Sequence, residues 1–111
     1  MLGVDRPQPP ELHRELSLAL HTAVASMLDE EMVGEARRKL DQWLAQGGSS
    51  APLLLRWREI LFLPLDEIRG WLTDGSEEAA WLRKASPFAG ALPPRERENI
   101  IRDTRRRLGR R

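Results

Sequence analysis

Apolar residues recur along this chain at steps of three and four, with polar and charged residues between them. That spacing places the apolar side chains on one face of a helix. The acidic run Asp29–Glu31 separates two such stripes and suits the start of the second helix, because acidic side chains stabilise the positive end of a helix dipole. Gly47-Gly48 ends the second helix. The two stripes consist of Leu12, Leu16, Leu20, Val24 and Met27 with Leu28, and of Met32, Val33, Ala36, Leu40, Trp43 and Leu44.

A third and a fourth helix follow. Ser50 and Pro52 predict the cap and the first turn of the third helix, because proline is tolerated where the first N–H groups have no partner. Pro64 ends that helix and opens the fourth, since the residue before a proline avoids helical angles. The expected buried faces carry Leu54, Trp57, Ile60 and Leu61, and then Leu65, Ile68, Trp71 and Leu72.

The last third of the chain predicts two more helices. Asp74-Gly75 is a turn, and Ser76 is the expected N-cap of a fifth helix that stops before Pro87. A last helix runs from about Pro93 to Leu108. The expected apolar residues are Ala80, Trp81 and Leu82, and then Ile100, Ile101, Thr104 and Leu108.

No stretch alternates apolar and polar residues with β-branched enrichment, as a strand would. The sequence therefore predicts an all-α fold, a compact bundle of five to six short helices with no sheet. We expect an irregular N-terminal arm at 1–9, one helical domain at 10–108, and a basic tail end at 109–111. Cysteine is absent, which excludes disulfides and thiolate metal sites. The sequence also has no long apolar run and no signal-type start, so we expect a cytoplasmic protein without a membrane contact.

A net charge of +1 hides an asymmetry. Residues 1–94 carry ten Lys/Arg and fourteen Asp/Glu, and residues 95–111 carry eight Arg and three acidic residues. The body is therefore acidic and the tail is basic. Such a split is typical of an interaction tail, which contacts nucleic acid or an acidic partner. The arginines that we expect to contact nucleic acid are Arg102, Arg105, Arg106, Arg107, Arg110 and Arg111.

No residue pattern predicts catalysis, a metal or a cofactor. His13 and His21 lie eight residues apart on one predicted helix, about 12 Å along its axis, which is too far for one metal ion, so we expect surface or boundary histidines. The acidic residues at 29–31 and 77–78 lie at predicted helix starts, where the helix dipole accounts for them. Neither a serine elbow nor a glycine-rich phosphate loop is present.

Two features are candidates for binding another protein. Most tryptophans are expected in the core, but one at its edge, such as Trp81, would be a natural hot spot. The loop Ser86–Gly90 has two interpretations. It is either a core plug, with Phe88 turned inward, or a small apolar docking surface framed by cations, with Arg83 before it and Arg95 after it.

This part of the chain resembles a known signature. It contains Ser76-Glu77, then Leu82-Arg83-Lys84-Ala85-Ser86-Pro87-Phe88-Ala89-Gly90-Ala91-Leu92, then Pro94-Arg95-Glu96-Arg97. The segment is similar to the Leu-Arg-Gln-x-Ser-Pro-Phe-Ala-Gly-x-Leu signature of a family of small, helical bacterial proteins, and Leu12-His13 matches a Leu-His pair near the start of that family. The resemblance covers residues 11 to 103. It departs at Lys84, where glutamine is usual, and at Asn99, where an aromatic residue often stands. The family has no assigned activity.

A second resemblance is to the toxin-binding domain of Xre/MbcA/ParS-type antitoxins. Trp81-Leu82-Arg83, Pro87, Gly90 and Pro94 have the spacing of a Trp-Leu-Arg, Pro, Gly, Pro stretch in that family. The likeness implies a helical domain that dimerises and blocks the active site of a partner toxin. The chain departs from the family at Arg95-Glu96-Arg97-Glu98, where an apolar turn is usual.

These observations lead to one expected function and one alternative. We expect a non-enzymatic protein-interaction module, antitoxin-like or accessory to a toxin, whose partner-binding residues are Arg83, Phe88, Arg95, Trp81 and Ser86. The alternative is a small nucleic-acid-binding or transcription-associated protein that uses its arginine-rich last helix. Pairing of two copies is open in both cases.

Overall fold

The computed structural model describes residues 10–48 and 50–109. They form six helices: α1 (Pro10–Met27), α2 (Glu30–Gln46), α3 (Ala51–Ile60), α4 (Leu65–Thr73), α5 (Glu77–Arg83) and α6 (Pro94–Gly109). The described residues contain no strand, so the predicted all-α bundle of short helices is confirmed. The expected arm at 1–9 and the tail residues Arg110 and Arg111 lie outside the described residues.

Local sequence sets most of the helix starts. Asp29 caps α2 by accepting the N–H of Met32 at 2.8 Å, and Ser76 caps α5 by accepting the N–H of Ala79 at 3.1 Å. Ser50 occupies the N-cap position of α3, but its side chain makes no capping hydrogen bond there. Each of these starts agrees with the sequence, but two details differ: Asp29 acts as a capping residue, where the sequence predicted a dipole effect, and the side chain of Ser50 does not cap.

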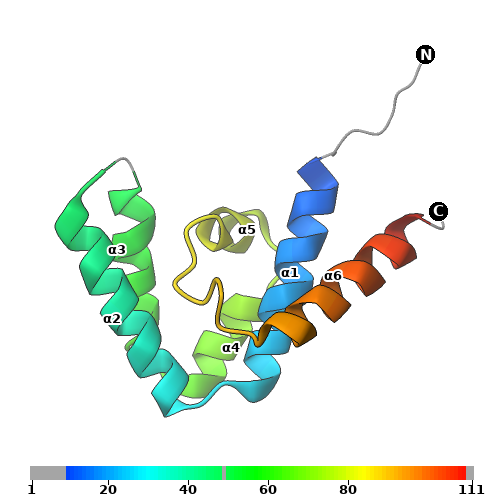
Figure 1. Ribbon diagram of the computed structural model, residues 1–111. Helices are drawn as coiled ribbons and strands as arrows, with labels where there is room; N and C mark the ends of the chain where they lie inside the picture. The colour runs from blue at the N-terminus through cyan, green and yellow to red at the C-terminus, as the bar shows by residue number, and fades with distance from the viewer. Residues whose placement is uncertain (1–9, 49, 110–111) are drawn as a thin grey trace.

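The helices form two groups that α5 joins (Figure 1). In one group α1 packs against α4 and α6, and in the other α2 pairs with α3. The short helix α5 lies between the groups and contacts α1, α3 and α4. The segment that the sequence singled out therefore occupies the junction of the fold.

Trp57 lies at the centre of the core and is fully buried. Its indole N–H donates to the carbonyl of Leu82 at 2.7 Å, which satisfies the one polar atom of the ring. Phe88 meets the same ring edge-on, with centroids 6.0 Å apart and planes at 69°. The core around this pair contains Val24, Ala25, Leu28, Val33, Ala36, Leu40, Leu54, Ile60, Leu61, Ile68, Leu72, Leu82 and Leu92.

The apolar face of α5 differs from the expected one. Ala79, Leu82 and Arg83 are buried, whereas Trp81 is 46% exposed. Residues three and four apart share one side of a helix, so burying 79, 82 and 83 turns Trp81 away from the core. No helix among the described residues is both long enough and apolar enough to cross a membrane.

Candidate functional site

The loop after α5 is a plug for the core. Phe88 is only 2% exposed, and Ser86 is buried beside it. Gly90, with a φ of 83°, provides the left-handed turn that returns the chain toward α6. The buried positions of Phe88 and Ser86 agree with the core-plug interpretation. They correct the expectation that these two side chains are accessible to a partner. The physical reason is the ring of Trp57, which supplies an apolar surface that Phe88 covers.

A buried hydrogen-bond chain ties this loop to α1. The Ser86 hydroxyl lies 2.8 Å from Nε2 of His21, and Nδ1 of His21 lies 2.7 Å from the carbonyl oxygen of Ser17. We assign the proton to Nδ1, because only a donor satisfies a carbonyl; the Ser86 hydroxyl then donates to Nε2. Ser86 Oγ also accepts the N–H of Phe88 at 3.0 Å. Within this chain of hydrogen bonds, the Ser86 hydroxyl and both ring nitrogens of His21 therefore have partners.

Burial favours the neutral form of His21. Burial lowers its pKa most strongly; the hydrogen bond to Ser17 opposes this shift, and the nearby charge of Arg83 adds to it. His13 is exposed, as expected, but His21 is buried rather than a surface residue. The sequence did contain a signal for this: His21 stands three and four residues before Val24 and Ala25, which puts it on the buried side of α1.

The Ser86–His21 contact has the length of a nucleophile–base pair, but its surroundings are structural. The hydroxyl is buried and already accepts the Phe88 N–H. The group that orients His21 is a backbone carbonyl instead of a carboxylate, and Ser86 is not among the residues that line a hollow next to His21. The pair secures the loop against α1.

Arg83 is buried as well, being 7% exposed, and it reaches the end of α4. Its Nη1 donates to the carbonyl oxygens of Asp74 at 2.9 Å and Trp71 at 3.4 Å. Its buried Nε has no hydrogen-bond partner among the residues that the structure describes. Burial lowers the pKa of Arg83, the charge of Asp74 opposes the shift, and the charge of Arg14 adds to it. Arg83 thus stabilises the negative end of the α4 dipole and still carries an incompletely satisfied charge.

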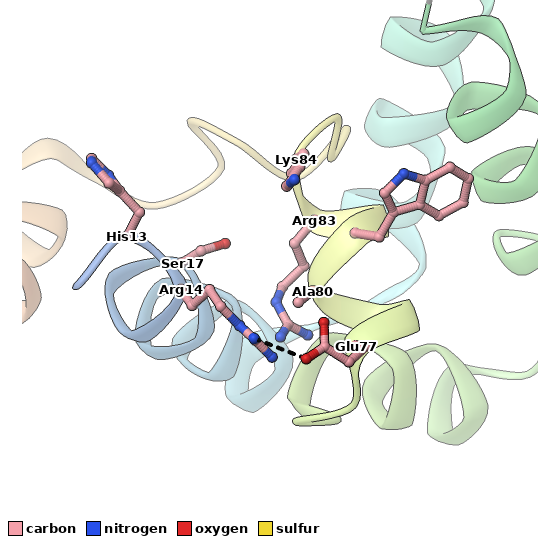
Figure 2. A pocket seen from close by; sticks show the side chains of 8 residues that line it. His13, Arg14, Ser17, Glu77, Ala80, Arg83 and Lys84 are labelled. Atoms are coloured by element: carbon pink, nitrogen blue, oxygen red, sulfur yellow. Dashed lines mark hydrogen bonds and ion pairs between the residues drawn. The ribbon is translucent and has the colours of Figure 1, made fainter. Parts of the chain in front are cut away.

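A hollow of about 690 Å³ lies between α1 and α5, and Arg83 is one of the residues that line it (Figure 2). We call it the α1–α5 hollow. Arg14 on α1 and Glu77 on α5 form an ion pair across it, with Nη1 and Oε2 3.3 Å apart. The exposed Trp81 also lines it. The full lining is His13, Arg14, Ser17, Glu77, Ala80, Trp81, Arg83 and Lys84.

A second hollow, of about 380 Å³, adjoins the first and shares His13, Ser17 and Arg83 with it. It lies between α1, α6 and the loop after α5, and Arg97 and Arg105 of α6 line it. We call it the α1–α6 hollow. Across the two linings Glu77 is the only carboxylate. The basic side chains there, besides the neutral His21, are His13, Arg14, Arg83, Lys84, Arg97 and Arg105.

The other expected contact residues are scattered over α6. Arg95 is exposed at the start of the helix and lines neither hollow. Arg107 pairs with Glu15 of α1 at 3.9 Å, and Arg102 pairs with Asp103 at 3.5 Å. Arg106 is exposed. The structure therefore places Trp81, Arg83 and Arg105 at the two adjoining hollows, and it leaves Arg95, Arg102, Arg106 and Arg107 outside both linings.

Within the described part of the chain, no group of three or more His, Asp or Glu side chains is placed to hold a metal ion. No family model matches the chain, and no match was found among curated proteins or among solved structures. The two resemblances drawn from the Ser76–Arg97 segment therefore stay predictions.

Proposed function

We propose that this protein is a non-enzymatic interaction module that binds another protein at the α1–α5 hollow, in the way an antitoxin occludes its toxin. The supporting observation is the side chain of Trp81, which is 46% exposed. It lines the α1–α5 hollow together with Arg83 and Lys84, and that lining contains one carboxylate. Tryptophan and arginine are the residue types that dominate binding energy at protein interfaces. We place this interaction in the cytoplasm.

The charge of the hollow indicates the surface that it fits. A partner that presents acidic side chains to His13, Arg14 and Lys84 would be steered to the site and held in register there. The stems of Arg14 and Lys84 and the indole of Trp81 supply apolar contact area around those charges. The contact set we propose is therefore Arg14, Trp81 and Lys84, in place of Phe88 and Ser86.

A binding experiment with matched aromatic variants tests this proposal. The tagged protein captures its partner from a lysate of the native host, and the partner is then purified and titrated calorimetrically. Trp81→Ala should weaken binding about thirtyfold, as expected of a hot spot. Phe62→Ala is the control, because Phe62 is 72% exposed but lies outside the hollow, over Arg37. Equal losses for both variants, or none for Trp81→Ala, would contradict the proposed surface. Light scattering of the purified protein establishes whether one copy or two make up the module.

One observation favours a second candidate, nucleic-acid binding through α6. Arg102 and Arg106 lie four residues apart, so they share a side of α6, and both are exposed. The double variant Arg102→Gln/Arg106→Gln is preferable to a truncation at 104, because Thr104 is buried. If α6 binds duplex DNA, this variant should lower the slope of log affinity against log salt by about 2. Unchanged binding would exclude these two contacts.

A further inference from the structure

Arg83 carries a buried charge that the protein itself pairs incompletely. Its Nη1 is used by the end of α4, its Nε has no partner, and no carboxylate of the described residues forms an ion pair with it. A buried cation without a paired anion is costly, so an anion that reaches it gains more than it would at an exposed arginine. Arg14 lines the same hollow from α1, and its charge disfavours the charged form of Arg83. A negatively charged group at this place would therefore stabilise both the buried charge of Arg83 and the neighbouring charge of Arg14.

Glu77 partly supplies that charge. In Figure 2 the guanidinium groups of Arg14 and Arg83 extend from α1 and α5 toward the region where the Glu77 carboxylate lies. Glu77 pairs with Arg14 at 3.3 Å, but its side chain is 91% exposed. Pairs this exposed contribute little stability, because water and salt screen them. Glu77 is therefore a carboxylate that can be displaced from the mouth of the hollow at little cost.

We propose that Arg14 and Arg83 form a binding site for a carboxylate side chain of the acidic partner protein, and that Glu77 is the internal carboxylate which this side chain displaces. The inference rests on the proposed function, since the partner supplies the acid. Guanidinium groups match carboxylates with paired N–H donors. Ser17 and Lys84 line the same hollow.

The test uses the isotope-labelled full chain and a hexaglutamate peptide, with hexaglutamine as the neutral control. NMR shifts on titration should be largest for the Arg83 Nε–H and for the backbone of Ser17 and Lys84. Inorganic phosphate forms a separate titration. Shifts with phosphate but not with hexaglutamate would assign the site to a free phosphate group and overturn the proposed ligand.

Two glutamates one residue apart make the displacement testable. Glu77→Gln should tighten hexaglutamate binding about two- to fivefold, the range expected from losing an exposed ion pair that competes with the ligand. Glu78→Gln removes the same charge from the same helical turn, but Glu78 pairs with Arg56 on α3 at 3.6 Å and does not line the hollow. Equal tightening by both variants would indicate general electrostatics and overturn the inference.

Arg14→Gln should weaken hexaglutamate binding about tenfold or more. The side chain of Arg14 is half-exposed, so its loss leaves the core intact. Unchanged affinity in this variant would also overturn the inference.

The two proposals fail separately. If a partner is captured through Trp81 but Glu77→Gln does not change the affinity for hexaglutamate, the protein-binding function stands and the carboxylate site is wrong. If hexaglutamate binds as expected but no partner depends on Trp81, the site stands and the proposed function is wrong.

Discussion

His21 is a neutral ring inside a helical core, and this state has a consequence for stability. Burial lowers its pKa below the usual value of about 6.5. Between that value and the lower pKa of the folded state, the unfolded chain binds a proton that the folded protein does not. The free energy of unfolding should therefore fall as the pH is lowered through this window, by at most about 1.4 kcal/mol per pH unit. Urea unfolding at pH 7.5, 6.5 and 5.5 measures the slope.

Two variants separate His21 from the other titrating groups. His21→Gln should be less stable than the wild type at pH 7.5 and should show a flatter pH dependence, because the titrating ring is gone. His13→Gln is the control, because it removes an exposed histidine from the same helix. A wild-type slope equal to that of His21→Gln would show that the ring does not titrate as we expect.

Ser86 holds two buried groups at once, which makes it a sensitive position. Ser86→Ala leaves Nε2 of His21 and the N–H of Phe88 without partners. Each unsatisfied buried group costs about 1–3 kcal/mol, so we expect a loss of at least that size in the free energy of unfolding. Ser26→Ala is the control, because Ser26 is exposed and its hydroxyl donates to the carbonyl of Ala23 within its own helix. A loss as small as that of Ser26→Ala would mean that water replaces the hydroxyl.

The direction of Phe88 was not predictable from the sequence around it. Pro87 and Gly90 predict the loop, and both the inward and the outward ring agree with that pattern. The deciding contact is with the ring of Trp57 on α3, which no local spacing reveals. The hydrogen-bond partners of Arg83 were not predictable from local sequence either, because they are carbonyls at the end of α4.

At the scale of helices, arginines from one helix repeatedly cap another. Arg37 of α2 donates to the carbonyl of Leu61 at the end of α3, and Arg83 donates at the end of α4. Arg69 of α4 donates to the carbonyls of Ala25 and Leu28 at the end of α1, both at 3.2 Å. α1 and α4 have no basic residue in their own last turn, so the cation comes from elsewhere. Arginine suits this task because its planar fork reaches two carbonyls at once.

Arg69→Lys tests whether the end of α1 needs the two N–H donors that a guanidinium group holds in one plane. Lysine keeps the positive charge at the end of α1 but replaces two fixed donors by one flexible ammonium group. We expect a loss of about 1–2 kcal/mol in the free energy of unfolding, measured from the urea midpoint. Arg38→Lys should change stability by less than about 0.5 kcal/mol, because Arg38 is exposed and pairs with Glu35 of the same helix. Equal small losses would mean that charge alone caps α1.

Helix ends were predictable where one side chain decides them. Asp29 and Ser76 accept backbone N–H groups of their own first turns. Ser76 was predicted as an N-cap, and the acidic run that begins at Asp29 predicted the start of α2 through the helix dipole. The buried face of α5 was not predictable in this way. The helix has only seven residues, so its apolar positions do not recur often enough to show which side faces the core.

At the scale of the molecule, the fold rearranges the charge pattern of the sequence. The sequence separates an acidic body from a basic tail, but α6 packs against α1. Arg97 and Arg105 therefore adjoin His13 and Arg83 across the α1–α6 hollow. Positions this far apart along the chain have no common signal in one sequence. The candidate site accordingly emerges only from the packing, while Trp81 and Arg83 were individually indicated.

The junction formed by α5 and its loop should make the whole domain unfold as one unit. Trp57 of α3 bonds to Leu82 of α5 and touches Phe88, while His21 of α1 bonds to Ser86. Weakening one contact of this junction should therefore destabilise both helix groups equally. Trp57→Phe removes the indole donor and some buried volume, and we expect it to cost about 1.5–3 kcal/mol.

Hydrogen exchange followed by mass spectrometry measures this cost separately in peptides of α2–α3 and of α1, α4 and α6. If the slowest amides of both groups lose the same free energy in Trp57→Phe, the two groups open together. A loss confined to α2–α3 would show that they unfold independently, and that α5 joins them in space without coupling their stability. Equal losses would also indicate that a partner bound at α5 and α1 stabilises α2 and α3, which it does not touch, because ligand binding to a cooperative domain protects all of it.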